Sequence, residues 1–246
     1  MNIIFLGTPD FVLPIKDGLT KHFTLVDTLE KADLAVVAAY GRILTKSELE
    51  MPKFGAINVH PSLLPKYRGP SPIQAAILNG DKITGITIIK MDEEVDHGPI
   101  IYQEELELSN IDNFDTLSKK CFQRSAEILP QIIEDFVSGK IKLVPQDHTK
   151  ATYCERLTRE SGYFPIDNPP TPENLDKMIR AYHPWPGVWT KWNGKIVKFL
   201  PSPRHPEERS DEGSNYLLQM EGKKPISLKD FINGYPNFPF QPTYLG

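Results

Sequence analysis

The chain has 246 residues and a formal net charge of −4, with 39% hydrophobic and 24% charged residues. These values fit a globular protein with one large domain or two modest ones. The negative charge argues against a broadly basic nucleic-acid surface, and no apolar run approaches the ~18 residues of a membrane span. The N-terminus lacks the basic start of a signal peptide, and the two cysteines lack metal-type spacing. We therefore expect a cytoplasmic, reduced, monomeric protein that binds no membrane and no metal.

The first sixty residues alternate apolar runs with turn and helix signals. Residues 2–6 form an apolar run before a Gly-Thr-Pro-Asp turn, and apolar residues then recur at helical spacing over 11–19. The nearly continuous apolar run 34–39 predicts a parallel strand that is buried on both faces. A further strand is predicted over 55–60, and Pro61 ends it because proline has no backbone N–H to donate.

The next ninety residues predict a short helix, two more strands and a long helix. The strands are expected over 84–91 and 99–105. Apolar spacing predicts a helix over 114–136, which Pro130 should kink or split because it removes one backbone donor. Strands that alternate with helices predict an α/β fold over residues 1–150, with a doubly wound, mostly parallel, Rossmann-like sheet.

The composition changes in the C-terminal part of the chain. Residues 151–182 carry several prolines and a short helical pattern, which predicts a linker. Residues 183–246 predict a small β-rich domain, with a hairpin at Asn193-Gly194. Too few strand-like runs remain for a complete five-stranded barrel, so we expect a truncated OB-like domain. The segment 204–213 has six charged residues in ten and no apolar ones, which predicts a disordered loop.

Three polar residues are the candidates for chemistry. Asn58 and His60 are two positions apart in a predicted strand, so both side chains point to one face at its C-terminal end, where open α/β sheets bind ligands. Asp96 lies in a Gly/Pro-rich turn after another strand. An amide can donate to an oxyanion, an imidazole can transfer a proton, and a carboxylate can orient the imidazole and hold its tautomer. This set suits direct acyl transfer to an amine, because no Ser or Cys nucleophile is paired with the histidine.

Other interpretations of these residues stay open at this level. A lone Asn or His at a strand end is usually a turn or capping residue. His60, Asp96 and His97 would need a recognisable ligand spacing to predict a metal site, and they lack it. Arg68 can contact a phosphate or carboxylate, or lie in a surface turn. The turn after the first strand lacks the GxGxxG pattern, so dinucleotide binding is not predicted.

Five stretches of the chain resemble, in order, the folate-dependent formyltransferases, and most closely the members that act on methionyl-tRNA. The stretches are residues 5–11, 39–44, 57–74, 84–101 and 183–190. The resemblance implies transfer of a formyl group from 10-formyltetrahydrofolate to the amino group of methionyl-tRNA, with charged initiator tRNA as the partner. It also implies that Asn58, His60 and Asp96 are the catalytic set.

The resemblance further implies where the two substrates bind. The folate pocket is expected between the stretch 39–43 and the loop 91–96, and the acceptor is expected beside the segment that follows the histidine. The expected folate-binding residues are Ala39, Tyr40, Gly41, Ile43, Met91, Asp92 and Val95. The expected acceptor-binding residues are Ser62, Leu63, Leu64, Pro65 and Arg68.

The chain departs from that family in two places. Only 24 residues separate Gly7 from Ala32, where the family has a further strand, a helix and a basic loop, and the C-terminal barrel is shortened. We expect these departures to weaken tRNA selection more than formyl chemistry. Two alternatives therefore remain: an N-formyltransferase that acts on a nucleotide-linked amino sugar, and a folate-binding remnant without activity.

Overall fold

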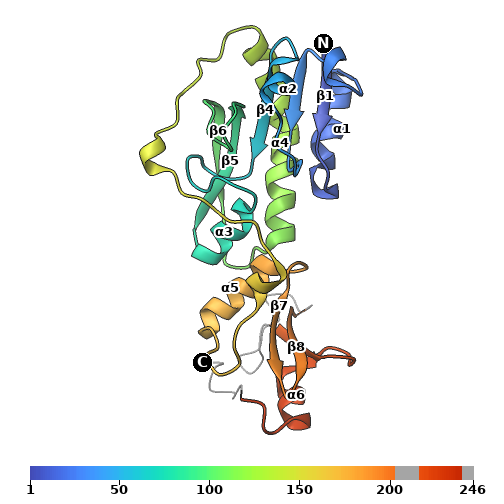
Figure 1. Cartoon of the computed structure of the whole chain (residues 1–246), viewed down its shortest axis with the longest axis vertical. Coiled ribbons are helices and arrows are strands. Elements are labelled where there is room, and N and C mark those ends of the chain that lie inside the picture. The colour runs from blue at the N-terminus through green and yellow to red at the C-terminus, as the bar shows by residue number, and fades with distance from the viewer. Residues whose placement is uncertain (203–215, 240–246) are drawn as a thin grey trace. The chain divides into compact units, whose positions relative to one another are not determined.

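A computed structural model describes residues 1–202 and 216–239 (Figure 1). The chain divides into two compact units. The N-terminal unit comprises Met1–Ala76, Asp81–Leu108 and Thr116–Arg156, and the C-terminal unit comprises Ile77–Gly80, Ser109–Asp115 and Leu157–Gly246. The loop predicted to be disordered, 204–213, lies outside the described residues. No helix in the described part of the chain combines the length and apolar character that a membrane crossing demands.

A six-stranded sheet forms the centre of the N-terminal unit, in the order β2-β1-β3-β4-β5-β6. Its strands are β1 (Asn2–Leu6), β2 (Thr24–Leu25), β3 (Leu34–Val37), β4 (Ala56–His60), β5 (Ile83–Lys90) and β6 (Ile100–Glu107). The first four strands pair in parallel, whereas β5 and β6 run antiparallel to their neighbours. This mostly parallel sheet, flanked by helices, confirms the predicted Rossmann-like class.

The burial of the central strands follows from their sequence. All four residues of β3 are buried, as a strand that helices cover on both faces requires. The strand predicted over 34–39 ends earlier, at Val37, because the chain turns at Ala39, whose φ is +46°. In β4, Ile57 and Val59 are buried, and Asn58 between them is only partly buried. Asn58 is thus the one residue of β4 that is not fully buried, and it shares its face of the strand with the buried His60.

Helices flank this sheet, and α1 meets α4 at a glycine. The helices up to residue 150 are α1 (Leu13–His22), α2 (Lys46–Glu50), α3 (Pro72–Asn79) and α4 (Phe114–Val137), with the short helices η1 (Asp10–Val12), η2 (Leu29–Lys31) and η3 (His148–Lys150). The helix α4 runs unbroken through Pro130, so the expected split is wrong. Pro130 has no N–H for the Ala126 carbonyl, four residues earlier. A Cβ on Gly18 of α1 would lie 2.9 Å from that oxygen, so the missing side chain lets α1 pack there.

The C-terminal unit contains a four-stranded antiparallel sheet in the order β10-β9-β8-β7. Its elements are η4 (Arg159–Gly162), α5 (Pro172–Tyr182), β7 (Val188–Trp192), β8 (Lys195–Pro201), β9 (Tyr216–Met220), β10 (Ile226–Ser227) and α6 (Leu228–Gly234). The hairpin predicted at Asn193-Gly194 joins β7 to β8, and both turn residues have positive φ, at 47° and 74°. Phe199, Leu218 and Phe231 are buried in its core. The small β-rich C-terminal domain is thus confirmed.

Candidate active site

The structure brings Asn58, His60 and Asp96 together on one carboxylate oxygen. The Asn58 amide donates to Asp96 Oδ1 at 3.1 Å, and His60 Nδ1 lies 3.4 Å from the same oxygen. Both partners come from β4, two residues apart, so they share one face of the strand. The carboxylate comes from the loop after β5, which pairs antiparallel with β4 and so returns the chain toward Asn58. An amide, an imidazole and a carboxylate therefore form one connected group at the edge of the sheet.

The second oxygen of Asp96 is also bound. The Gly69 backbone N–H donates to Asp96 Oδ2 at 2.8 Å. Asp96 itself has a φ of +52°, in the left-handed region that costs an L-residue roughly 1–2 kcal/mol. Such a conformation persists only where the surroundings determine it. The position of the carboxylate is therefore built into the loop and does not depend on a free rotamer.

A backbone carbonyl, not Asp96, sets the tautomer of His60. His60 Nε2 lies 2.8 Å from the Tyr67 carbonyl oxygen. A carbonyl can only accept, so Nε2 carries the proton and the neutral ring keeps its lone pair on Nδ1. This corrects the expectation that Asp96 holds the tautomer. The carboxylate instead faces Nδ1, the nitrogen that keeps the lone pair in the neutral ring.

Two buried residues that sequence reasoning missed, or placed differently, support this loop. Gln146 donates its amide hydrogens to the carbonyls of Asp96 and Gly98, both at 2.8 Å. The Arg68 guanidinium donates to Gln146 Oε1 at 2.7 and 3.2 Å and contacts His148 Nδ1 at 2.8 Å. Arg68 is only 2% exposed, so it does not lie in a surface turn. Gln146 lies 50 residues from Asp96 in an irregular segment, so no periodic pattern marks it.

The expected acceptor segment is folded back on itself. Ser62 and Leu64 are buried, whereas Leu63 and Pro65 are partly buried. The Ser62 hydroxyl donates to the Lys66 carbonyl at 2.6 Å. The Leu64 N–H donates to the Thr87 hydroxyl at 3.1 Å, which in turn donates to the Ser62 carbonyl at 2.6 Å. Their polar groups therefore shape the loop beside His60, and the partly exposed side chains are those of Leu63 and Pro65.

The first expected folate loop, 39–43, is held by an ion pair. Arg42 binds Glu48 of α2 through both of its terminal nitrogens, at 2.8 and 3.0 Å, and this pair is the main reason that the pKa of Glu48 falls to about 2. Glu48 also caps α2 together with Thr45. The Ile43 side chain, between these contacts, is 72% exposed. The loop thus presents an apolar side chain to solvent from a fixed backbone.

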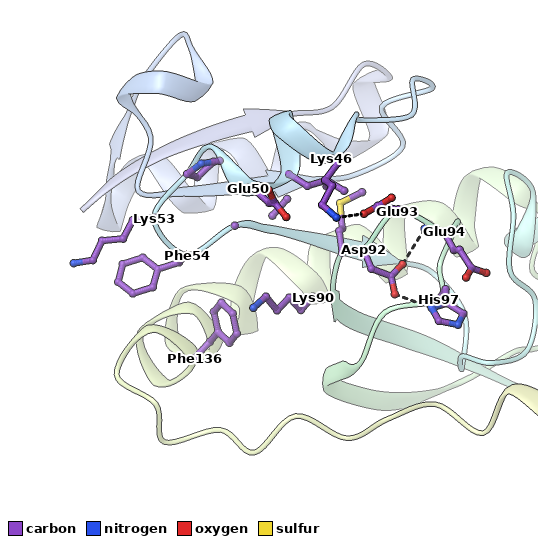
Figure 2. Close-up of a pocket in the computed structure, with 15 residues that line it drawn as sticks. Lys46, Glu50, Lys53, Phe54, Lys90, Asp92, Glu93, Glu94, His97 and Phe136 are labelled. Carbon is purple, nitrogen blue, oxygen red and sulfur yellow. Dashed lines mark hydrogen bonds and ion pairs between the residues drawn. The ribbon is translucent and has the colours of Figure 1, made fainter.

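The second expected folate loop, 91–96, faces a pocket of about 790 Å³ (Figure 2). Lys46 of α2 forms an ion pair with Glu93 at 2.9 Å, which links this loop to α2, the helix that follows the first expected folate loop. Figure 2 shows Asp92 and His97 on one side of the pocket and the rings of Phe54 and Phe136 on the other. Met91 and Asp92 line it, whereas the other expected folate-binding residues, Ala39, Tyr40, Gly41, Ile43 and Val95, do not.

The described residues hold no obvious metal centre or covalent nucleophile. No group of three or more His, Cys, Asp or Glu side chains in residues 1–202 and 216–239 is arranged to hold a metal ion. Cys154 lies close to the site, where burial raises the pKa of its thiol. The thiol donates to the Arg68 carbonyl at 3.3 Å. Cys154 therefore stays protonated and packs against the loop that holds Asp96.

Gly69 is expected to tolerate no side chain. Its φ is +113°, and a Cβ would lie 2.4 Å from the Cys154 carbonyl oxygen. Gly69→Ala should therefore lower the free energy of unfolding by about 3 kcal/mol, since it adds a backbone clash to the strain of a positive φ. Denaturant titration measures this change. Gly139→Ala is the matched control, because Gly139 has a φ of +73° with open space around it. Equal losses for the two variants would show that the clash is absent.

Two family models match the chain. The model described as "Formyl transferase" matches residues 21–133, and "Formyl transferase, C-terminal domain" matches residues 166–215. A methionyl-tRNA formyltransferase of Roseiflexus castenholzii is 39% identical over 83% of this chain and 71% of its own length. The chain belongs to the formyltransferase family. A methionyl-tRNA formyltransferase of Kosmotoga olearia is 47% identical over 69% of the chain, and this match spans only 54% of the Kosmotoga protein.

Solved structures of formyltransferases share the fold at lower identity. Methionyl-tRNA formyltransferase from Clostridium thermocellum has a TM-score of 0.67 at 20% identity, over 92% of this chain and 99% of that one. HypX from Aquifex aeolicus in complex with tetrahydrofolic acid has a TM-score of 0.70 at 19% identity, over 96% and 47%. A sugar N-formyltransferase from Shewanella has a TM-score of 0.68 at 18% identity, over 83% and 98%. At these identities the likeness shows that the chain shares their fold, and it does not identify the acceptor.

Proposed function

We propose that the chain transfers a formyl group from 10-formyltetrahydrofolate to the amino group of methionyl-tRNA. The observation that carries this proposal is the convergence of Asn58 and His60 on one oxygen of Asp96. An amide donor beside an imidazole whose free nitrogen faces a carboxylate provides the three groups that acyl transfer to an amine needs. All three side chains come from one chain, which supports a monomer as the active form.

The reaction begins when the acceptor amine attacks the formyl carbon. A carbon–nitrogen bond forms, and the electron pair of the carbonyl moves onto its oxygen. The amine then gives one proton to His60 Nδ1, where Asp96 stabilises the imidazolium. When the carbonyl re-forms, the bond from carbon to the folate nitrogen breaks, and His60 returns the proton to that nitrogen. The products are the formylated amine and tetrahydrofolate, so the imidazole ends as it began.

Asn58 supplies the donor for the oxyanion. Its amide carries two hydrogens, and one of them is donated to Asp96 at 3.1 Å. That bond fixes the orientation of the amide, so the second hydrogen points to a constant position. A fixed donor costs no reorganisation when charge develops on the formyl oxygen. Asp96 thereby organises both the proton acceptor and the oxyanion donor.

The folate donor is supported by the two loops beside the site. Ile43 on the first loop is 72% exposed, and Val95 on the second loop is 52% exposed. The Lys46–Glu93 ion pair links the second loop to α2, the helix that follows the first loop. When a flat aromatic ligand covers these exposed apolar side chains, apolar surface is removed from water, which favours binding of the ligand. Met91 and Asp92 of the second loop also line a pocket of about 790 Å³, whose aromatic and polar walls suit a heterocyclic ligand.

The acceptor is inferred from the relatives. The Roseiflexus relative is a methionyl-tRNA formyltransferase, and its match covers 83% of this chain, hence parts of both units. The likeness to a sugar N-formyltransferase, at 18% identity, concerns the fold. Methionyl-tRNA is therefore the acceptor that the observations favour, and a charged initiator tRNA is the partner. We expect such a reaction on charged tRNA to take place in the cytoplasm.

One assay tests both the chemistry and the acceptor. The protein is incubated with 10-formyltetrahydrofolate and, in parallel reactions, with charged initiator methionyl-tRNA or with a nucleotide-linked amino sugar. We expect formylmethionine on the tRNA and a matching release of tetrahydrofolate, with no formylated sugar. Formylation of the sugar alone would replace the proposed acceptor but keep the chemistry. Folate binding without turnover on either amine would contradict the proposed activity.

A further inference from the structure

A buried glutamine outside the proposed catalytic set holds the backbone of Asp96. Gln146 is 5% exposed, and its side-chain amide donates to the carbonyl oxygens of Asp96 and Gly98, each at 2.8 Å. Both amide hydrogens are therefore used on two carbonyls of the same turn. The contact fixes the carbonyl groups of the two residues that flank His97, and one of these residues is Asp96 itself.

The other end of Gln146 is held equally firmly. Its Oε1 accepts from Arg68 Nη2 at 2.7 Å and from Nε at 3.2 Å. Arg68 directly precedes Gly69, whose N–H donates to Asp96 Oδ2 at 2.8 Å. Residues 68–69 therefore hold Asp96 in two ways. The Gly69 N–H binds its carboxylate directly, and the Arg68 side chain binds Gln146, which in turn binds the Asp96 backbone carbonyl. Each donor and acceptor of the Gln146 amide has a partner, which is the condition for a buried polar group to add rigidity.

Asp96 needs such a grip because its backbone is strained. A φ of +52° is unfavourable for an aspartate, so the peptide relaxes toward negative φ when its contacts are removed. Rotation about φ swings the side chain away from His60 and Asn58. A displacement of about 1 Å at a reacting group can lower a rate by up to ~10²-fold. The two amide hydrogen bonds of Gln146 oppose this rotation.

We propose that Gln146 is a positioning residue for formyl transfer: it holds the Asp96 backbone in the left-handed conformation that presents the carboxylate to Asn58 and His60. The inference rests on the proposed function for its kinetic consequence. Its structural consequence, the place of the Asp96 carboxylate, can be observed without turnover. The two consequences are therefore tested separately.

Two variants of Gln146 separate its contacts. Gln146→Leu removes every polar contact, whereas Gln146→Glu keeps an acceptor for Arg68 and places an oxygen against the two carbonyls. Both variants lose the grip on Asp96. In amide NMR spectra, the Gly69 N–H resonance of each should move toward its position in Asp96→Ala, since its hydrogen bond to the carboxylate is lost. Thr190→Val is the matched control: it removes one buried hydrogen bond to a carbonyl in the C-terminal unit and should leave Gly69 unmoved.

Kinetics give the second readout. Both Gln146 variants should lower kcat for formyl transfer about 10- to 100-fold, with KM for folate and for the acceptor within twofold of the wild type. An unmoved Gly69 resonance with wild-type kcat would overturn the proposal. Wild-type behaviour of Gln146→Glu alone would also overturn it, because only the Arg68 contact would then matter. A moved Gly69 resonance in a protein that formylates no amine would uphold the grip on Asp96 and contradict the proposed function instead.

Discussion

Replacing His60 with alanine is expected to lower kcat for formyl transfer by about 10³-fold, within the range that positioned acid–base groups contribute. The variant loses the group that takes the proton from the attacking amine and returns it to the folate nitrogen. The Nε2–H bond to the Tyr67 carbonyl makes Nδ1 the acceptor in the neutral ring. The alanine variant retains Asn58 and the folate loops, so KM for the folate should change little.

The measurement is single-turnover formylation, with folding checked by denaturant unfolding. Added imidazole should restore part of the rate, since the cavity left at residue 60 lies beside Asp96. His22→Ala is the control, because His22 is an exposed histidine at the end of α1. It should keep the wild-type rate. A His60→Ala rate within tenfold of the wild type would refute the proton transfer assigned to this residue.

Asp96→Asn is expected to reduce kcat by a similar factor, about 10³-fold, although it changes a single atom type. Asp96 accepts hydrogen bonds at both oxygens, from Asn58 at Oδ1 and from Gly69 at Oδ2, with His60 Nδ1 also facing Oδ1. An asparagine has only one carbonyl oxygen. Its NH2 group must then face either the Gly69 N–H or the Asn58 NH2, and in both orientations a donor opposes a donor. In the second orientation the NH2 group also donates to His60 Nδ1 and occupies the lone pair that takes up the proton.

The kinetic test is a double-mutant cycle of His60→Ala and Asp96→Asn. Because the carboxylate acts in part through the imidazole, the loss in the double variant should be smaller than the product of the two single losses. The loss that remains beyond His60→Ala is the part that Asp96 exerts through the Asn58 amide. Asp135→Asn is the matched control: this partly exposed aspartate on α4 pairs with Lys140 at 3.1 Å and should leave the rate unchanged. Rate losses that multiply in the double variant would mean that Asp96 and His60 act independently.

The central pair of the site is predictable from sequence because strands have a strict period. Asn58 and His60 lie two residues apart in an apolar run, and the structure places both against one carboxylate. To predict that Asp96 joins this pair, one has to assume only that the two strand-like runs before His60 and before Asp96 are neighbours in the sheet. The antiparallel pairing of β4 with β5, with Ile57 opposite Lys90, provides this arrangement. Local pattern and one tertiary contact are enough for this part of the site.

The supporting contacts lie beyond such reasoning, for physical reasons. The Tyr67 carbonyl that sets the tautomer of His60 is a backbone group, and every residue has one. The positive φ of Asp96 arises from tertiary contacts, since aspartate lacks the freedom of glycine. Gln146 lies in an irregular segment between α4 and η3, where no periodicity indicates which side chains are buried. Such groups become visible only when distant segments are folded together.

The narrow outer border of the N-terminal sheet has a consequence for solution behaviour. The edge strand β2 is two residues long and pairs with β1 at Asn2 and Ile3. Unpaired backbone groups along a long, flat strand act as a template on which another molecule can add a strand. A two-residue strand offers very few of them, and β1 continues past it for only three residues. At this edge the sheet therefore offers too few unpaired backbone groups for a strand of a neighbouring molecule to add to it.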